Sequence, residues 1–424
     1  MNMIFVLIKI SIVLGGLMTA AAYFVLLERR MAAWVQDRIG PNRVGIPLTK
    51  IRLFGLGQPL ADGVKFIMKE EYTPAHVDKK LFVLAPIVIL VAALSTFAVI
   101  PFGSMLPPLG GLLPASLFGE EVSNAPIDLV VAPGANVGII YVFALSSIAV
   151  YGVILGGWAS NNKYSLLGGL RSSAQMIAYE LPLGLGLLGV VLASGSMDLG
   201  VIISSQASTG IWFGIAQPLG FFVFVVAAFA EAARLPFDLP ECEQELIGGY
   251  HTEYSGIKLL LFLVAEFLHM IAASFLIVIL FLGGWHFWGL TGGTPEINGW
   301  GFTWGGAAWL QALLRIGVLM TKITLVIMCF MLIRWSWPRF RFDQLMALAW
   351  KVMLPLGLIN FVAVATLQQV QLALTGSVGQ SWLMVPVAWV IAIVAWVGIN
   401  IAAPLVADNR PRRDLDSWEI DSQV

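Results

Sequence analysis

The chain has 424 residues, of which 58% are hydrophobic and only 12% are charged. Soluble domains carry roughly 25% charged residues, so this composition excludes a single soluble core and predicts a membrane protein. The net charge of −1 and the lack of a basic, aromatic-rich segment argue against a nucleic-acid partner. Two cysteines cannot build an iron–sulfur site or a disulfide framework, so any redox centre must lie in a partner or be a diffusible molecule.

Nine apolar runs have the length that a membrane-spanning helix requires, which is about 20 residues. They lie at 3–27, 81–101, 136–159, 174–195, 212–232, 257–283, 309–334, 352–372 and 383–405. The charges of the first run come after it, at Arg29 and Arg30, which favours an uncleaved anchor over a signal peptide. We therefore predict an all-α polytopic membrane protein with about nine transmembrane helices.

The positions of Lys and Arg predict its orientation. Of the 24 basic residues, only Lys9, Arg315 and Lys322 lie inside the runs. The others lie in alternate connections or at their rims, whereas the loops 102–135, 196–211, 284–308 and 373–382 contain none. By the positive-inside rule, the N-terminus faces outward and the C-terminus faces the cytoplasm.

The first cytoplasmic connection, about 28–80, contains an amphipathic segment. Pro59 suits a first helical turn, and apolar residues then recur at helical spacing opposite a charged face: Leu60, Val64, Ile67 and Met68 against Asp62, Lys65 and Lys69. We predict a helix over about 59–70. It either lies along the membrane interface or packs on the cytoplasmic ends of its neighbours.

Ionisable residues inside the runs are candidates for function. Glu180 lies about two turns into the fourth run, Glu231 ends the fifth, Glu266 is near the middle of the sixth, and Lys322 is near the middle of the seventh. Because such a group is costly in a bilayer, it usually faces a cavity or a partner. We expect Glu180 and Glu266 to exchange protons; the alternative is that Glu266 and Lys322 form a structural ion pair.

Other polar residues in the runs have plainer interpretations. Lys9 and Arg315 lie near the outward ends of their helices, where we expect their side chains to snorkel to the interface. His269 follows Glu266 by three residues, and we expect it to be a packing residue. No spacing in the sequence predicts a metal site.

The segment 236–256 holds five of the 25 acidic residues: Asp238, Glu241, Glu243, Glu245 and Glu253. Pro236 and Pro240 favour irregular backbone, which is tolerated near a membrane where it lines a cavity. Clustered carboxylates facing a cavity would titrate as a coupled unit. The alternative is a solvated acidic loop.

Five segments closely resemble one family, the membrane H subunit of respiratory complex I, the proton-pumping NADH:quinone oxidoreductase. They are "ERRMAAWVQDRIGPNRVG" at 28–45, "QPLADGVKFIMKE" at 58–70, "RSSAQMIAYELP" at 171–182, "EAARLPFDLPECEQELIGGYHTEYSG" at 231–256 and "IRWSWPRFRFDQLMALAWK" at 333–351. The likeness extends from about residue 5 to 372. It implies a core over 1–372, followed by an extra helix and a tail over 373–424.

The resemblance also implies a function. Members of this family bind no prosthetic group and form the entry and wall of a chamber for a diffusible quinone of the ubiquinone type. The FMN and the iron–sulfur clusters are expected in partners, among them hydrophilic peripheral-arm subunits, one of which carries the terminal cluster. Small membrane subunits and antiporter-like subunits are the expected membrane neighbours, and a bacterial plasma membrane is favoured over an organellar inner membrane.

Matching the motifs position by position assigns expected roles. Glu180 and Tyr179 match the fourth-helix positions that begin the charged axis, and Glu266 and Lys322 fit polar positions of later helices. The coupling loop matches Glu231, Arg234, Asp238, Glu241, Glu243, Glu245 and Glu253, and the chamber entrance matches Arg29, Arg30, Arg38 and Asp62. Ala233 departs from the family, which commonly has Asn or Asp there.

The sequence therefore predicts a membrane component that couples quinone reduction to proton translocation and catalyses no reaction alone. One alternative is the homologous component of a ferredoxin- or hydrogenase-linked membrane complex. A second is a stand-alone ion or proton antiporter, which would be expected to show inverted repeats. A third is a purely structural anchor for a soluble dehydrogenase.

Overall fold

The structure is a computed structural model that describes residues 3–45, 53–107, 126–238, 247–288, 290–291, 308–375, 382 and 384–402. Within these ranges the regular structure is helical, apart from an isolated antiparallel bridge between Leu106 and Ile127. The predicted all-α class is therefore confirmed.

Seven of the described helical segments are long and apolar enough to cross a membrane, which confirms a polytopic membrane fold. They are α1 (Met3–Val35), α3 (Lys79–Thr96), α6 (Gly138–Ala159), α7 (Lys163–Ser194), α12 (Gly256–Phe281), α13 (Ala308–Ser336) and the continuous helix from α14 (Phe342–Ala347) to α15 (Leu354–Thr375). The fifth and ninth predicted runs correspond to shorter apolar helices within α10 (Pro218–Glu231) and α16 (Met384–Ala402). The total of nine spans and the outward N-terminus stay predictions.

Several helices differ in extent from the apolar runs, and the local sequence explains why. α7 begins at Lys163, well before the predicted start at 174, because the Asn162 side chain accepts a hydrogen bond of 3.0 Å from the Tyr164 backbone and caps a polar first turn. The fifth run breaks at Gln217, since the following Pro218 disfavours a helical residue before it. A short helix, α9 (Phe213–Ala216), precedes that break.

The eighth run is preceded by six further helical residues and one π-helical turn. This turn, Leu348–Met353, joins α14 to α15 without interrupting the helix. Single π-helical turns are frequent at functional sites. Here the turn begins three residues after Leu345, whose carbonyl oxygen accepts a hydrogen bond from a predicted site residue described below.

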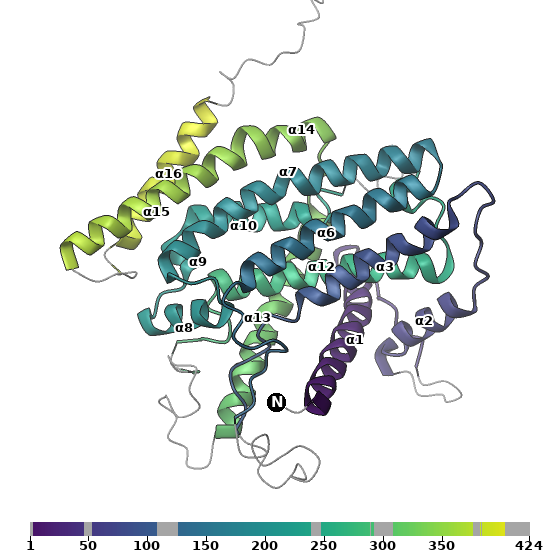
Figure 1. Cartoon of the computed structure of the whole chain (residues 1–424), viewed down its shortest axis with the longest axis horizontal. Coiled ribbons are helices and arrows are strands. Elements are labelled where there is room, and N and C mark those ends of the chain that lie inside the picture. The colour runs from purple at the N-terminus through teal and green to yellow at the C-terminus, as the bar shows by residue number, and fades with distance from the viewer. Residues whose placement is uncertain are drawn as a thin grey trace, which may run out of the picture.

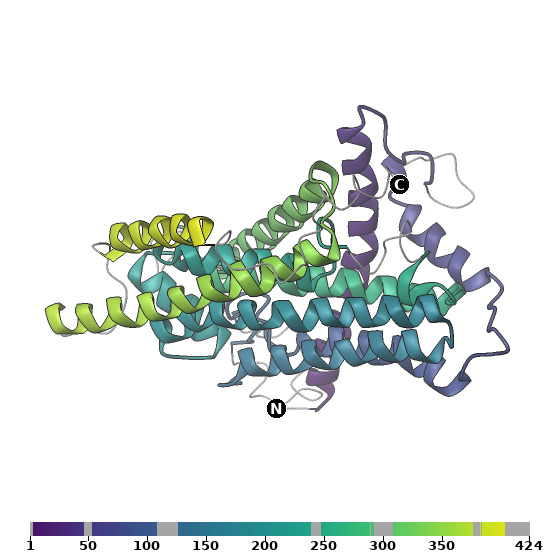
Figure 2. The ribbon, with the colours of Figure 1, turned by 90° about the horizontal axis from the view of Figure 1, so that it is seen from above.

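The apolar helices fall into two orientations. α6, α7, α10 and α15 run side by side, whereas α1 and α13 lean steeply across them (Figures 1 and 2). α12 is the most buried of the seven long apolar helices. A small helix, α2 (Gln58–Met68), has no buried residue and lies beside α1 and α12. It corresponds to the predicted amphipathic segment.

Glycines allow α6 and α7 to approach closely. A Cβ atom at Gly157 would lie 2.8 Å from the Ser165 carbonyl oxygen and 3.4 Å from the Gly169 Cα atom. Since real Cβ atoms are not found so close to a backbone oxygen, only glycine fits at this crossing. The close approach brings polar side chains of α6 within reach of α7.

Candidate functional site: a cavity beside α1, α2 and α12

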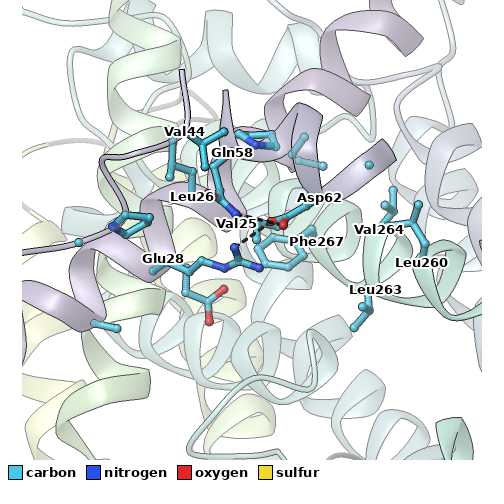
Figure 3. A pocket seen from close by; sticks show the side chains of 18 of the residues that line it. Val25, Leu26, Glu28, Val44, Gln58, Asp62, Leu260, Leu263, Val264 and Phe267 are labelled. Carbon is cyan, nitrogen blue, oxygen red and sulfur yellow. Dashed lines mark hydrogen bonds and ion pairs between the residues drawn. The ribbon is translucent and has the colours of Figure 1, made fainter. Parts of the chain in front are cut away.

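A cavity of about 1260 Å³ lies between α1, α2 and α12. Its walls also include the segment 38–44, Arg234 and the end of α13 at Arg334 and Trp335. Part of the lining is apolar and comes mainly from α1 and α12: Met18, Val25, Leu26, Leu260, Leu263, Val264 and Phe267. Figure 3 shows Leu260, Leu263 and Val264 on the α12 side and Val25 and Leu26 near α1. The cavity is large enough for a drug-sized organic molecule.

The other part of the lining is charged and is richer in cations than in anions. It contributes five arginines and three carboxylates: Arg29, Arg38, Arg43, Arg234 and Arg334 with Glu28, Asp62 and Glu266. A ligand that combines an apolar tail with oxygen acceptors would match such a lining. The cavity therefore has the chemistry of a site for an amphipathic, oxygen-bearing molecule.

An ion pair connects α1 to α2 at the cavity rim. Arg29 Nη1 lies 2.8 Å from Asp62 Oδ2, and Gln58 Nε2 donates to Asp62 Oδ1 at 3.1 Å (Figure 3). Of the other predicted entrance residues, Arg38 lines the cavity and donates to Gln36, whereas Arg30 donates to the Phe54 carbonyl. The structure thus brings Arg29, Arg38 and Asp62 together and places Arg30 outside the lining.

Glu28 connects two arginines that come from distant parts of the chain. It forms an ion pair with Arg334 of α13, and its second oxygen lies 3.9 Å from Arg234 Nη1. The Arg234 guanidinium also stacks over the Phe267 ring of α12, 4.3 Å from the centroid. Arg234 is only 7% exposed.

Arg234 keeps spare hydrogen-bonding capacity. Its Nε and Nη2 atoms are buried and have no hydrogen-bond partner among the residues that the structure describes. A buried donor without a partner costs about 1–3 kcal/mol, which a ligand's oxygen would recover. Arg234 lines the cavity, so a rotation of its side chain would turn these two donors toward a bound acceptor.

Glu266 of α12 also lines the cavity and has two partners from the segment before that helix. Tyr250 donates to Glu266 Oε1 at 2.9 Å, and His251 Nε2 lies 3.2 Å from the same oxygen. The charge of Arg234 acts on Glu266 as well. The cavity lining therefore holds both the Glu28–Arg234 ion pair and the Glu266 carboxylate.

Two further glutamates, one on α10 and one on α7, form a second group beside α6. Ser146 donates a hydrogen bond to Glu231 at the end of α10, and Ser147 donates to Glu180 of α7. The charge of Glu180 acts on Glu231. Glu231 is joined to the cavity group by the chain itself, since Arg234 follows three residues later in the turn that ends α10.

The remaining described site candidates lie outside both groups. Tyr179 donates to the Leu345 carbonyl at 2.9 Å, just before the π-helical turn. Asp238 is buried, with Arg339 Nη2 at 3.8 Å, and Glu253 accepts from Asn162 at 2.7 Å. Glu241, Glu243 and Glu245 lie outside the described residues.

Lys322 lies elsewhere and has different partners from those of Glu266. Its Nζ atom donates to three carbonyl oxygens just beyond α12, at 2.7 Å to Leu282, 3.0 Å to Gly284 and 2.6 Å to His286. It also lies 4.3 Å from the Trp212 ring centroid. The alternative of a Glu266–Lys322 ion pair is therefore wrong.

The expectation for Arg315 is also wrong, because its side chain does not snorkel to the interface. Arg315 is 1% exposed and donates to the Thr291 carbonyl at 3.0 Å. The chain after α12 reaches α13 at this point, so a backbone oxygen replaces interfacial water as the acceptor. Lys9 is partly buried, and its Nζ atom donates to the Val130 carbonyl at 2.7 Å.

Comparison with known proteins decides the family. The model of the NADH dehydrogenase family matches residues 8–365. The chain is 45% identical over 342 residues to an H subunit of the NADH-quinone oxidoreductase of Cytophaga hutchinsonii, covering 81% of this chain and 90% of that protein. It is 45% identical over 356 residues to an H subunit of the same enzyme in Geobacter metallireducens, covering 84% and 94%.

A third relative, the H subunit of the NADH-quinone oxidoreductase of Leptospira biflexa, is 44% identical over 363 residues, covering 85% of this chain and 94% of that protein. This chain belongs to the H-subunit family of NADH-quinone oxidoreductase. The resemblance inferred from the five segments is confirmed. The protein is thus a multi-pass membrane component of an oxidoreductase complex, respiratory complex I.

Several residues that form contacts in these two groups were not predicted from the sequence of this family member. Glu28 stands immediately before the assigned Arg29 and Arg30, and Arg334 lies in the quoted segment 333–351, but neither was assigned a role. Ser146 and Ser147 form a polar doublet inside an apolar run, which is the signal that was available for them. No group of three His, Cys, Asp or Glu residues able to hold a metal ion occurs in the described part of the chain.

Proposed function

We propose that the cavity is the quinone entry of the complex and part of its quinone chamber. The observation that carries this proposal is the pairing of an apolar wall with the spare donors of Arg234. An isoprenoid tail would lie along Val25, Leu263 and Val264, and a headgroup carbonyl oxygen would accept from Arg234. Small-molecule sites commonly combine an apolar lining with a few orienting polar groups.

Quinone reduction is coupled, in this proposal, to proton translocation by the carboxylates. A quinone that receives two electrons draws two protons, which changes the charge near Glu28, Arg234 and Glu266. That change would reach Glu231 through the turn containing Arg234, and from Glu231 it would reach Glu180. Ionisable groups inside membrane spans commonly serve such relays.

The position of Glu180 supports transfer to a neighbouring protein of the membrane arm. Ile177 and Leu181, which flank it on α7, are 53% and 50% exposed. A carboxylate beside an outward apolar face is costly against lipid, so this face suits a protein neighbour. We infer that antiporter-like and small membrane subunits lie here.

The other partners follow from the electron path. Hydrophilic peripheral subunits would hold the FMN and the iron–sulfur clusters, which would supply the electrons for quinone reduction. The family's coupling loop, which matches Asp238, Glu241, Glu243, Glu245 and Glu253, would extend the coupling path toward this arm. Since the relatives are bacterial proteins, we place the complex in a bacterial plasma membrane.

A pair of tryptophan variants on α12 tests the quinone path. Val264→Trp fills the cavity wall, whereas Ile257→Trp alters an exposed position on the same helix that does not line the cavity. In the assembled complex, Val264→Trp should raise the KM for a long-tailed quinone at least tenfold and change the KM for a short-tailed quinone less. The proposal would be contradicted if Val264→Trp had the same KM values as Ile257→Trp for both the long-tailed and the short-tailed quinone.

The same assembled complex tests the alternative electron donor. NADH should reduce quinone in membranes that contain the complex, and reduced ferredoxin or hydrogen should not replace it. Activity with ferredoxin or hydrogen and none with NADH would favour the alternative membrane complex.

A further inference from the structure

Two adjacent serines of α6 contact two different glutamates on two different helices. Ser146 donates to Glu231 of α10, and Ser147 donates to Glu180 of α7. All four side chains are partly buried. α6 is thus the element that contacts both members of the glutamate pair by hydrogen bonds.

These serines differ from hydroxyl residues that satisfy themselves within a helix. Ser11 of α1 donates to the Leu7 carbonyl, and Thr324 of α13 donates to the Met320 carbonyl, each four residues back in its own helix. That local bond is the usual choice for a Ser or Thr in a helix interior. Ser146 and Ser147 instead bind the carboxylates of neighbouring helices.

The chemistry of a hydroxyl suits a carboxylate that changes its protonation state. A serine both donates and accepts, and its hydrogen rotates. It donates to an ionised carboxylate and accepts from a protonated one, so the contact persists in both states. An alanine at either position would leave the glutamate to rotate away or to bind elsewhere.

We propose that Ser146 and Ser147 are positioning residues for proton translocation. From α6, they hold Glu231 of α10 and Glu180 of α7 at adjacent positions. The pair keeps the two carboxylates close enough for a charge change at Glu231 to act on Glu180. This inference rests on the proposed coupling function. It assigns the serines no contact with quinone and no part in electron transfer.

The test compares two isosteric double variants in the assembled complex. Thr and Val have nearly the same shape, but only Thr carries a hydroxyl. We expect Ser146→Thr/Ser147→Thr to keep the number of protons translocated per NADH oxidised. Ser146→Val/Ser147→Val should lower that number by at least half, with the KM for quinone unchanged because neither serine lines the cavity. Proteoliposomes report both quantities.

Ser11→Val is the matched control, because Ser11 bonds only to its own helix. If the valine double variant assembles and translocates protons at the wild-type ratio, the inference is wrong. If it does not assemble, the single variants Ser146→Ala and Ser147→Ala are measured instead, and wild-type ratios in both overturn the inference.

Glu180→Gln separates this inference from the proposed function. If Glu180→Gln leaves the ratio unchanged, the carboxylate coupling itself fails. If Glu180→Gln lowers the ratio while the serine variants do not, only the role of the serines fails.

Discussion

Arg29 and Asp62 form an ion pair of 2.8 Å that joins α1 to α2 across the rim of the cavity. α2 has no buried residue, and this pair is a directional contact that holds it to α1. Both side chains are partly exposed, at 47% and 26%. The pair therefore positions a wall of the cavity more than it stabilises the fold.

Replacing Asp62 should loosen that wall. Pairs of this exposure contribute about 0.2–1 kcal/mol, so Asp62→Asn should raise the KM for quinone about two- to fivefold and leave kcat nearly unchanged. Steady-state NADH:quinone kinetics measure both. Lys65→Gln, on α2 but outside the cavity lining, is the control, and an equal rise in that variant would contradict the prediction.

Arg234 should be sensitive even to a substitution that keeps its charge. Lysine lacks the planar guanidinium that stacks on Phe267 and carries the two spare donors. We expect Arg234→Lys to lower kcat/KM for quinone at least tenfold, which corresponds to about 1.4 kcal/mol of lost transition-state stabilisation. Near-normal kinetics in Arg234→Lys would show that charge alone matters and that the donors bind no quinone oxygen.

Glu180→Gln distinguishes a coupling role from that of a structural anchor. The amide keeps the shape and can still accept from Ser147 but does not exchange protons. Quinone reduction coupled to proton translocation should fall sharply, by about tenfold or more, because removing a positioned proton-transfer group typically costs at least this much. Full activity in a normally assembled complex would favour the anchor interpretation. Glu180→Asp, which keeps a carboxylate, should retain part of the activity.

Lys322 should act on stability. Lys322→Met removes the donor for three carbonyl oxygens, and an unsatisfied buried acceptor costs about 1–3 kcal/mol. The Tm of the purified complex in detergent should therefore fall while the KM for quinone stays the same, since Lys322 does not line the cavity. A variant with an unchanged Tm and fewer protons translocated would instead place Lys322 in the proton path.

The sequence predicted the fold class well because the bilayer imposes one strong requirement, a long apolar helix. The helix boundaries were harder to predict, because they depend on local features such as the Asn162 cap and Pro218. The average hydrophobicity of a segment does not reveal such features. The start of α7 is the clearest case. Its first turns, residues 163–173, contain polar and glycine residues and lie outside the predicted apolar run, yet they are helical.

The candidate site was predicted in part. Motif matches found Arg29, Asp62, Arg234 and Glu266, which line one cavity. They did not predict which groups would pair, because pairing depends on contacts between segments far apart in sequence. Glu28 and Arg334 are separated by 306 positions.

α12 is held by side-chain contacts at two positions along its length, at Glu266 and just beyond its C-terminal end. Tyr250 and His251 bind its Glu266 near the cavity, and Lys322 binds the carbonyls just beyond its far end. These contacts at two positions oppose movement of α12 along its own axis. A molecule that enters the cavity therefore meets one wall, α12, that is anchored at both positions, and another, α2, that has no buried residue of its own.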